Sequence, residues 1–136
     1  MSTELEELYQ EVILDHSRRP RNFGALENAD VVVHGDNPSC GDEIHLGIQF
    51  GPNETLAEIK FSGQGCAISQ ASASMLTDDI KGKSLDEVAK LGKVDVLDNL
   101  GIEISPARMK CAMLSLETLR SAVGDRVSWQ GSVDES

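Results

Sequence analysis

The pattern of hydrophobic and polar positions divides the chain into helical segments at both ends and alternating segments between them. In the first segment the hydrophobic side chains recur every three or four residues, at Leu5, Leu8, Val12 and Ile13. This period is that of an amphipathic helix, and it predicts a helix over about 4–16. Pro20 limits the helix, because proline disfavours helical geometry in the residue before it.

The middle of the chain follows the two-residue period of half-buried strands. A short strand is predicted over 31–33, followed by a loop rich in glycine, proline and asparagine over 35–42. Two longer strands come next, and the segment 51–54 between them has the composition of a hairpin turn. The alternating hydrophobic positions of these strands are Ile44, Leu46, Ile48 and Phe50, and then Ala57, Ile59 and Phe61.

Helical spacing returns in the second half of the chain. Hydrophobic and small residues predict a helix over about 68–80, which Gly82 can end. Ser84 with Glu87 has capping-box spacing and predicts a short helix to about Leu91, followed by a looser segment up to Gly101. A long last helix is predicted to begin near Pro106 and to continue to about Val123.

This order of elements predicts the α+β fold class. We expect a three-stranded antiparallel sheet with helices packed on one face, since three strands are only marginally stable alone. The 136 residues fit one domain, spanning 1–136 with a core over about 4–123. The polar tail over about 124–136 is expected to be loose, with Trp129 as its anchor.

The composition narrows the classes of function. With 23 acidic and 12 basic residues the formal net charge is -11, which argues against a nucleic-acid partner. The first residues lack the basic and then apolar order of an export signal, and no apolar run approaches the roughly 18 residues of a membrane span. We therefore expect a cytoplasmic protein with no membrane partner.

Three cysteines, Cys40, Cys66 and Cys111, are candidates for chemistry. Their odd number and wide spacing argue against a disulfide framework, which leaves metal binding, thiol reactivity or three buried core residues. Each lies at a predicted junction: Cys40 in the glycine-rich loop, Cys66 at a helix start, and Cys111 in about the first turn of the last helix. A helix N-terminus stabilises a thiolate, and Lys110 would add to this if its ammonium turned inward.

Asp42 favours the metal interpretation, because it lies two residues after Cys40 and adds an oxygen ligand. Three thiolates and one carboxylate would complete the four ligands that zinc or a cluster iron accepts. No Cys-x-x-Cys pair is present, so a site would have to be assembled by the fold. The histidines His16, His34 and His45 lack paired ligand spacing, and we interpret them as ordinary structural or surface residues.

Several motifs together resemble the IscU/SufU/NifU N-terminal family of iron-sulfur cluster assembly proteins. The resemblance covers about Leu5 to Val123. Its motifs are Asp15-His16, Pro20-Arg21-Asn22, Asn37-Pro38-Ser39-Cys40-Gly41-Asp42, Phe61-Ser62-Gly63-Gln64-Gly65-Cys66-Ala67-Ile68-Ser69 and Lys110-Cys111.

The resemblance implies a SufE/NifU-like fold and a scaffold rather than an enzyme. Such a scaffold accepts sulfur from a cysteine desulfurase, binds iron or zinc, builds a transient [2Fe-2S] cluster and passes it to recipient apo-proteins or a carrier. By position, Cys40, Asp42, Cys66 and Cys111 correspond to its ligands, and Cys111 to the sulfur acceptor.

Two features leave the branch of the family open. Lys110 stands where typical IscU has histidine and SufU has lysine, yet Cys66 and Cys111 are only 45 residues apart, without the usual SufU insertion. The alternatives are therefore a cluster scaffold, a zinc-dependent sulfur acceptor that activates a SufS-type desulfurase, or a structural zinc protein. The segment 104–108 differs from the Leu-Pro-Pro-Val-Lys chaperone motif, which argues against an Hsp70-type partner.

Overall fold

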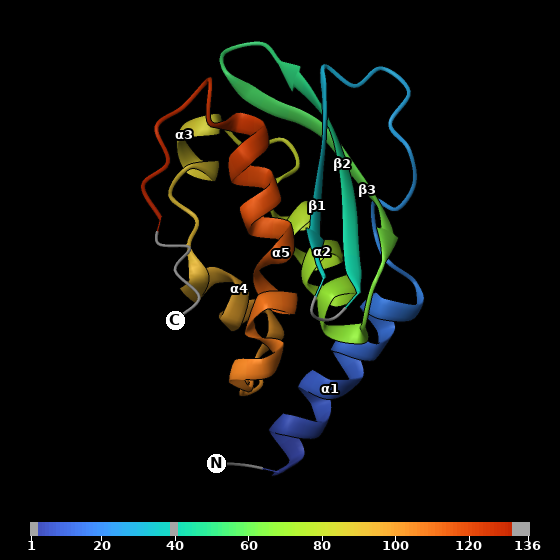
Figure 1. Cartoon of the computed structure of the whole chain (residues 1–136). Coiled ribbons are helices and arrows are strands. Elements are labelled where there is room, and N and C mark those ends of the chain that lie inside the picture. Colours follow the sequence, from blue (N-terminus) through green and yellow to red (C-terminus); the bar gives the residue numbers. More distant parts are fainter. Residues whose placement is uncertain (1–2, 39–40, 132–136) are drawn as a thin grey trace.

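The computed structural model describes residues 3–38 and 41–131 of the chain. Its elements follow in the order helix, three strands and four helices. They are α1 (Thr3–Arg18), β1 (Val31–Asn37), β2 (Asp42–Gly51), β3 (Thr55–Gln64), α2 (Ala67–Ile80), α3 (Leu85–Val88), α4 (Lys93–Leu100) and α5 (Pro106–Val123). The predicted fold class is confirmed, with a layer of helices against a three-stranded sheet (Figure 1).

The sheet has the order β1-β2-β3, and both strand pairs are antiparallel. Alternate residues of β2 and β3 point toward the helices, so the register pairs Leu46 with Phe61 and Ile48 with Ile59 on the buried face. The register also places Asn37 opposite Asp42 at one end of the sheet. Within β2, as far as the register shift after Gln49, side chains an odd number of residues after Asp42 lie on the outer face.

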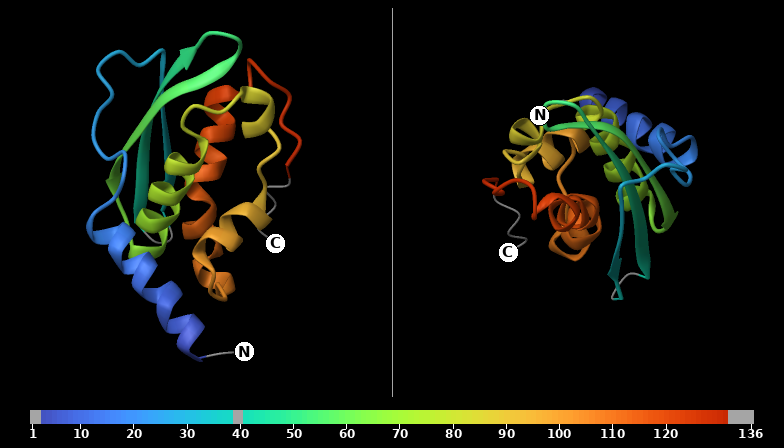
Figure 2. Two further views of the ribbon diagram at one scale, coloured as in Figure 1. Left: turned by 180° about the vertical axis from the view of Figure 1, so that it is seen from behind. Right: turned by 90° about the horizontal axis from the view of Figure 1, so that it is seen from above.

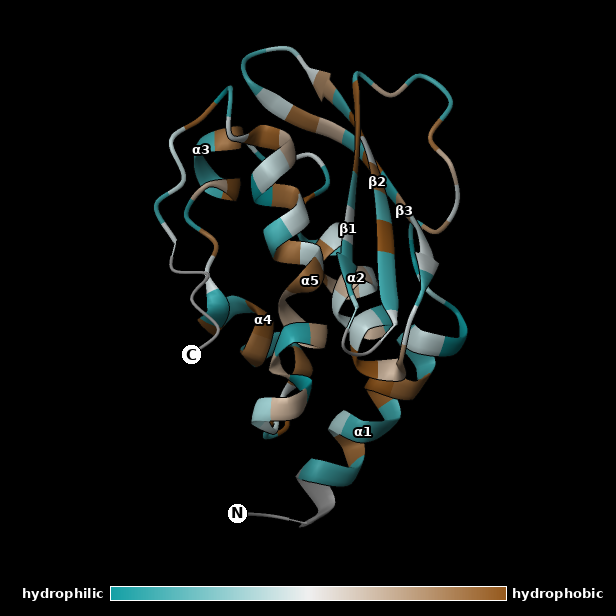
Figure 3. Cartoon of the chain, in the orientation of Figure 1, coloured by the Kyte–Doolittle hydropathy of each residue, from teal (hydrophilic) through white to brown (hydrophobic). Residues whose placement is uncertain are grey.

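The helices α2 and α5 cover the inner face of the sheet. α5 packs across β1 and β2, while α2 packs against β3 and also against α1, α4 and α5. The two views in Figure 2 show these helices on one side of the sheet, with α1 extending away from its end. Hydrophobic positions run along α4, α5 and the strands (Figure 3), and they close into one core.

Close approach between α5 and β1 depends on Gly35. A Cβ atom built at this position would overlap Thr118 Oγ1 and lie 3.3 Å from a methyl carbon of Leu114, both on α5. Because glycine has no side chain, the helix can lie directly on the strand. This contact fixes the height of α5 over the sheet, and therefore the height of Cys111.

The strand and helix boundaries differ most from the sequence prediction in two places. β1 continues to Asn37, where a loop was predicted from 35, because Gly35 and Asp36 pair with Ile44 and Glu43 in the hairpin. The looser segment predicted before Gly101 contains α4 instead. The Asp95 carboxylate accepts the Gly92 N–H at the start of α4, and Gly101 ends it with a left-handed backbone.

The stripe predicted on the first helix is only partly buried. Ile13 is buried against the core, but Leu8 and Val12 are exposed.

The tail that was expected to be loose is attached as far as Gly131, since the N–H groups of Gln130 and Gly131 donate to the carbonyl of Ala89. Among the described residues, no helix is both long and apolar enough to cross a bilayer.

Candidate metal and sulfur site

Asp42 is the first residue of β2 and is buried, with 2% of its surface exposed. Its Oδ1 accepts the backbone N–H of Cys66 at 3.0 Å, a bond that joins the start of β2 to the start of α2. Gly65 makes room for it, since a Cβ there would lie 2.7 Å from Asp42 Oδ1. The carboxylate is therefore held in place by the loop that carries Cys66.

Cys66 is the N-cap residue of α2. Its extended backbone turns the chain from β3 into the helix, and Ser69 Oγ donates to its carbonyl at 3.1 Å. The unpaired N–H groups and the dipole of α2 favour negative charge at this position. The predicted placement of Cys66 at a helix start is confirmed, and the thiol remains partly accessible.

Cys111 lies on α5 and is fully buried. Because α5 begins at Pro106, Cys111 is in the second turn, just beyond the first turn that the sequence indicated. The dipole effect falls off within the first turn of a helix, so α5 gives this thiol less support than α2 gives Cys66.

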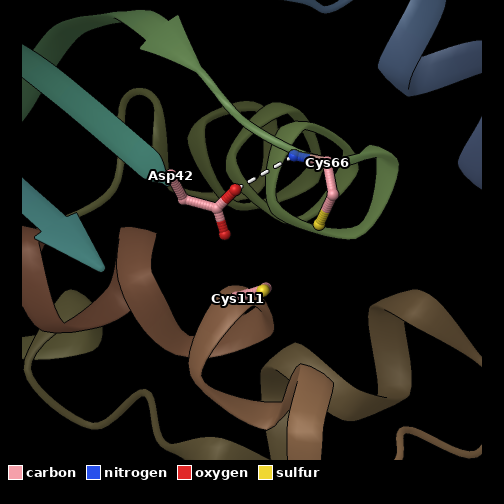
Figure 4. A group of neighbouring side chains, drawn as sticks. All are labelled: Asp42, Cys66 and Cys111. Carbon is pink, nitrogen blue, oxygen red and sulfur yellow. Dashed lines mark hydrogen bonds between the residues drawn. The ribbon is translucent and has the colours of Figure 1, made fainter. Parts of the chain in front are cut away.

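The fold brings Asp42, Cys66 and Cys111 together. One ligand atom from each lies within 4.8 Å of the other two, although the residues come from a strand and two different helices. Figure 4 shows the carboxylate and both sulfur atoms converging on one region. Tetrahedral zinc with thiolate ligands needs sulfur atoms about 3.8 Å apart, so small side-chain rotations suffice.

The second carboxylate oxygen supports the metal interpretation. Asp42 Oδ2 is buried and has no hydrogen-bond partner among the described residues. A buried charged oxygen without a partner is costly, and a cation is the usual compensation. The residues present therefore fit zinc or iron, since two sulfur ligands and one oxygen ligand are an accepted mixture for these metals.

Cys40, the fourth predicted ligand, lies outside the described residues. Within 3–38 and 41–131, Asp42, Cys66 and Cys111 form the one group of three or more acidic, cysteine or histidine side chains whose ligand atoms converge. The three histidines are not part of it.

The cation beside the sulfur atoms is Arg108, a residue that the sequence analysis did not select. The charges of Cys66 and Cys111, together with hydrogen bonds from its guanidinium to both, raise the pKa of Arg108. Lys110, which would have had this role if its ammonium turned inward, is exposed and borders a different hollow beside Asn37. Arg108 is three residues before Cys111, and that helical spacing was the signal that could have identified it.

Comparison with known proteins agrees with this fold. The family model described as the NifU-like N terminal domain matches residues 8–131, and the chain belongs to this family. The predicted resemblance is thus confirmed.

Two curated relatives represent the two branches of the family. The zinc-dependent sulfurtransferase SufU of Bacillus subtilis is 38% identical, and the alignment covers 88% of this chain and 91% of that protein. The iron-sulfur cluster assembly scaffold protein IscU of Aquifex aeolicus is also 38% identical, with 94% of this chain and 82% of the relative covered.

Solved structures share the fold. A crystal structure from Fervidobacterium islandicum, assigned to an iron-sulfur cluster assembly scaffold protein of the SUF system, has a TM-score of 0.75 and 32% identity. The alignment covers 87% of this chain and 98% of the chain in that crystal structure. The N-terminal part of a NifU-like protein from Brucella abortus has the same fold, with a TM-score of 0.71 at 16% identity.

Proposed function

We propose that this chain is a scaffold for iron-sulfur cluster assembly. The observation that carries the proposal is the convergence of Asp42, Cys66 and Cys111, with one Asp42 oxygen buried and unpaired. The relatives named as IscU scaffolds support it. In this proposal the chain works in the cytoplasm, receives sulfur from a cysteine desulfurase and delivers a [2Fe-2S] cluster to an apo-protein or carrier.

The proposed ligands are Cys40, Asp42, Cys66 and Cys111. Cys40 is included because it lies two residues before Asp42 in the sequence. The carboxylate is a harder and more readily exchanged ligand for a cluster iron than a thiolate, which suits a site that must release its cargo. Resident zinc would hold the same four side chains in their binding geometry until the cargo arrives.

Sulfur delivery requires a nucleophilic thiolate at the site. We assign this role to Cys111, whose thiolate would attack the outer sulfur of the desulfurase persulfide. The new S–S bond forms on Cys111, the old S–S bond breaks, and the desulfurase cysteine leaves as a thiolate. Arg108 favours the reacting form, because its positive charge lies beside both sulfur atoms.

The second candidate function is that of a zinc-dependent sulfurtransferase. Two observations favour it, namely Lys110 before the last cysteine and the SufU relative of Bacillus subtilis. In this function the persulfide on Cys111 is passed on as sulfur, and no cluster is built on the chain.

Anaerobic reconstitution distinguishes the two functions. The chain is incubated with ferrous iron, cysteine and a cognate desulfurase, and visible absorption is followed before transfer to an apo-ferredoxin. Cys66→Ser, which should lose metal, is the negative variant. Ser69→Ala is its matched control, because Ser69 contacts the Cys66 carbonyl without offering a thiolate.

A cluster that forms on the parent and on Ser69→Ala, fails on Cys66→Ser, and transfers to ferredoxin supports the scaffold. A parent that retains tightly bound zinc, holds no cluster and strongly stimulates desulfurase turnover contradicts the scaffold and supports the sulfurtransferase. An undiminished zinc content in Cys66→Ser would show that Cys66 is not a ligand of the site.

A further inference from the structure

Two histidines face each other on the outer surface of the sheet. The antiparallel register of β1 and β2 pairs His34 directly with His45, and such cross-strand neighbours have Cβ atoms about 5 Å apart. His34 is exposed and His45 is half-buried. Eleven residues separate them in the sequence, so linear spacing gave no sign of the pair.

The rings of the pair are oriented nitrogen to nitrogen. Their centroids are 4.5 Å apart, and the ring planes are nearly perpendicular, at 82°. Nδ1 of His34 and Nδ1 of His45 are in hydrogen-bond contact. One nitrogen must donate its N–H and the other must accept it with its lone pair, so the two ring nitrogens share a single proton.

A position at which two imidazole nitrogens converge can hold a metal ion once the shared proton has left. Imidazole is a preferred ligand of Zn²⁺, Cu²⁺ and Ni²⁺, with metal–nitrogen bonds of about 2.0–2.1 Å. Two such bonds at a tetrahedral or square-planar angle place the two nitrogens roughly 3 Å apart. The rings reach this separation when the two Nδ1 atoms move slightly apart. We propose that His34 and His45 form a second, surface site for a divalent transition metal, with the ion replacing the shared proton.

The neighbouring side chains surround the site with negative charge. Asp36 and Glu43 are paired in the next row of the same hairpin, two residues from His34 and His45 respectively. They therefore lie on the same face as the histidines. In the described part of the chain no third ligand atom converges with the two imidazoles, so water completes the coordination.

The site is accessible and separate from the thiolate site. Gly47, in the row on the other side of the pair, is covered by Leu26, since an added Cβ would lie 3.2 Å from the Leu26 Cβ. His34 lies outside the part of the sheet that Leu26 covers. Asp42 is three residues before His45 and therefore points to the opposite face of the sheet. The histidine pair can thus hold a metal ion without using any ligand of the Asp42–Cys66–Cys111 group.

The test uses the full chain without a histidine tag, loaded first with one equivalent of zinc for the thiolate site. Ni²⁺ is then added, and calorimetry gives the stoichiometry and affinity while histidine ring NMR signals identify the ligands. We expect one further equivalent of Ni²⁺, with paramagnetic broadening of the His34 and His45 signals. His34→Gln and His45→Gln should each weaken this binding by at least about tenfold, because even an outer-shell partner is worth that much.

His16→Gln is the matched control, because it removes a histidine outside the pair and should leave the Ni²⁺ affinity unchanged. Retained zinc in every variant shows that the fold and the thiolate site are intact. Absence of a second equivalent in the parent overturns the proposal. So does a second equivalent that persists in His34→Gln and His45→Gln, or that is lost equally in His16→Gln, which would indicate binding elsewhere on the acidic surface.

Discussion

At the scale of single residues, the two oxygens of Asp42 have different environments. Oδ1 is engaged by the Cys66 N–H, whereas Oδ2 is buried and unpaired among the residues described. The first interaction orients the carboxylate, and the second leaves one oxygen for a cation. A single oxygen ligand among sulfur ligands gives a cluster iron one weakly held coordination position. We therefore argue that Asp42 controls release of the cluster.

Asp42→Ala should therefore make a bound [2Fe-2S] cluster several-fold longer-lived, because the exchangeable oxygen ligand is removed. The half-life of the visible absorption in the presence of an iron chelator measures this. Glu43→Ala, on the neighbouring exposed carboxylate, should leave the half-life unchanged. Faster cluster loss from Asp42→Ala than from the parent would show that this side chain holds the cluster rather than releasing it.

Arg108 lies beside both sulfur atoms, so Arg108→Gln should slow alkylation of the accessible thiol, Cys66, in the metal-free protein a few-fold at neutral pH. The side chain is exposed, and the difference should shrink at high salt as the charge is screened. Mass spectrometry after timed alkylation measures the rates. Lys110→Gln is the control, and an equal effect from it would mean that general surface charge is responsible.

Residue identity could be predicted better than residue environment. Cys40, Asp42 and Cys66 were identified because glycine-rich loops surround them in the sequence, and Cys111 because it lies near the start of a predicted helix. Arg108 was missed although the predicted last helix already placed it one turn before Cys111, because only the neighbour Lys110 was considered as the cation. The histidine pair was missed because it depends on strand register.

At the scale of elements, the contact between α5 and β1 sets the position of Cys111. Gly35→Ala should destabilise the protein by about 1–3 kcal/mol, the usual cost of overpacking, because the new Cβ overlaps Thr118. Urea unfolding measures this. The double variant Gly35→Ala with Thr118→Ala removes the overlapping atoms and should recover part of the loss. If it recovers nothing, backbone strain rather than the helix contact explains Gly35.

The junction of α1 with α2 depends on His16. Its Nδ1 is 2.7 Å from Ser74 Oγ, which also accepts the backbone N–H of Arg21. Burial, aided by the charge of Arg21, lowers the pKa of His16, while Asp15, Asp78 and Asp79 oppose the shift. The folded state therefore favours the neutral ring, and the unfolded state binds a proton more readily.

The stability contributed by neutral His16 should be complete above about pH 6.5 and decrease below it, as protonation favours the unfolded chain. Urea unfolding of the metal-free protein at pH 7.5 and 5.5 should show a smaller pH effect in His16→Gln than in the parent. The pKa of Asp15 is lowered by Arg21 and Arg19, so its contribution is lost only at more acidic pH. Equal pH effects in parent and variant would contradict this interpretation.

Elements with a strong period were predicted well, and α3 was predicted from its Ser84–Glu87 cap, but α4 was not predicted. The alternation in β2 and β3 is visible in the sequence because one face of each strand is buried. The helices α2 and α5 show hydrophobic and small residues at helical spacing, although residues 71–77 and 111–116 are buried without a break. α4 has only eight residues, and its start depends on a hydrogen bond from Gly92 to Asp95. Such a bond is not a periodic signal.

At the scale of the whole molecule, the site lies where the end of the sheet meets two helices. Asp42 comes from β2, Cys66 from the start of α2 and Cys111 from α5, so no single element could form the site alone (Figure 4). One thiol is partly accessible and the other buried. A cluster or metal ion bound here would lie between the sheet and the helices and could still be reached by a partner protein.

The most direct test of the scaffold is cluster transfer from the reconstituted chain to an apo-ferredoxin with an iron chelator present. The scaffold account predicts that ferredoxin gains its cluster while the chelator takes up little iron, because the cluster moves intact. Iron captured by the chelator, with ferredoxin remaining in the apo form, would show that the chain does not hand on a cluster and would contradict the account.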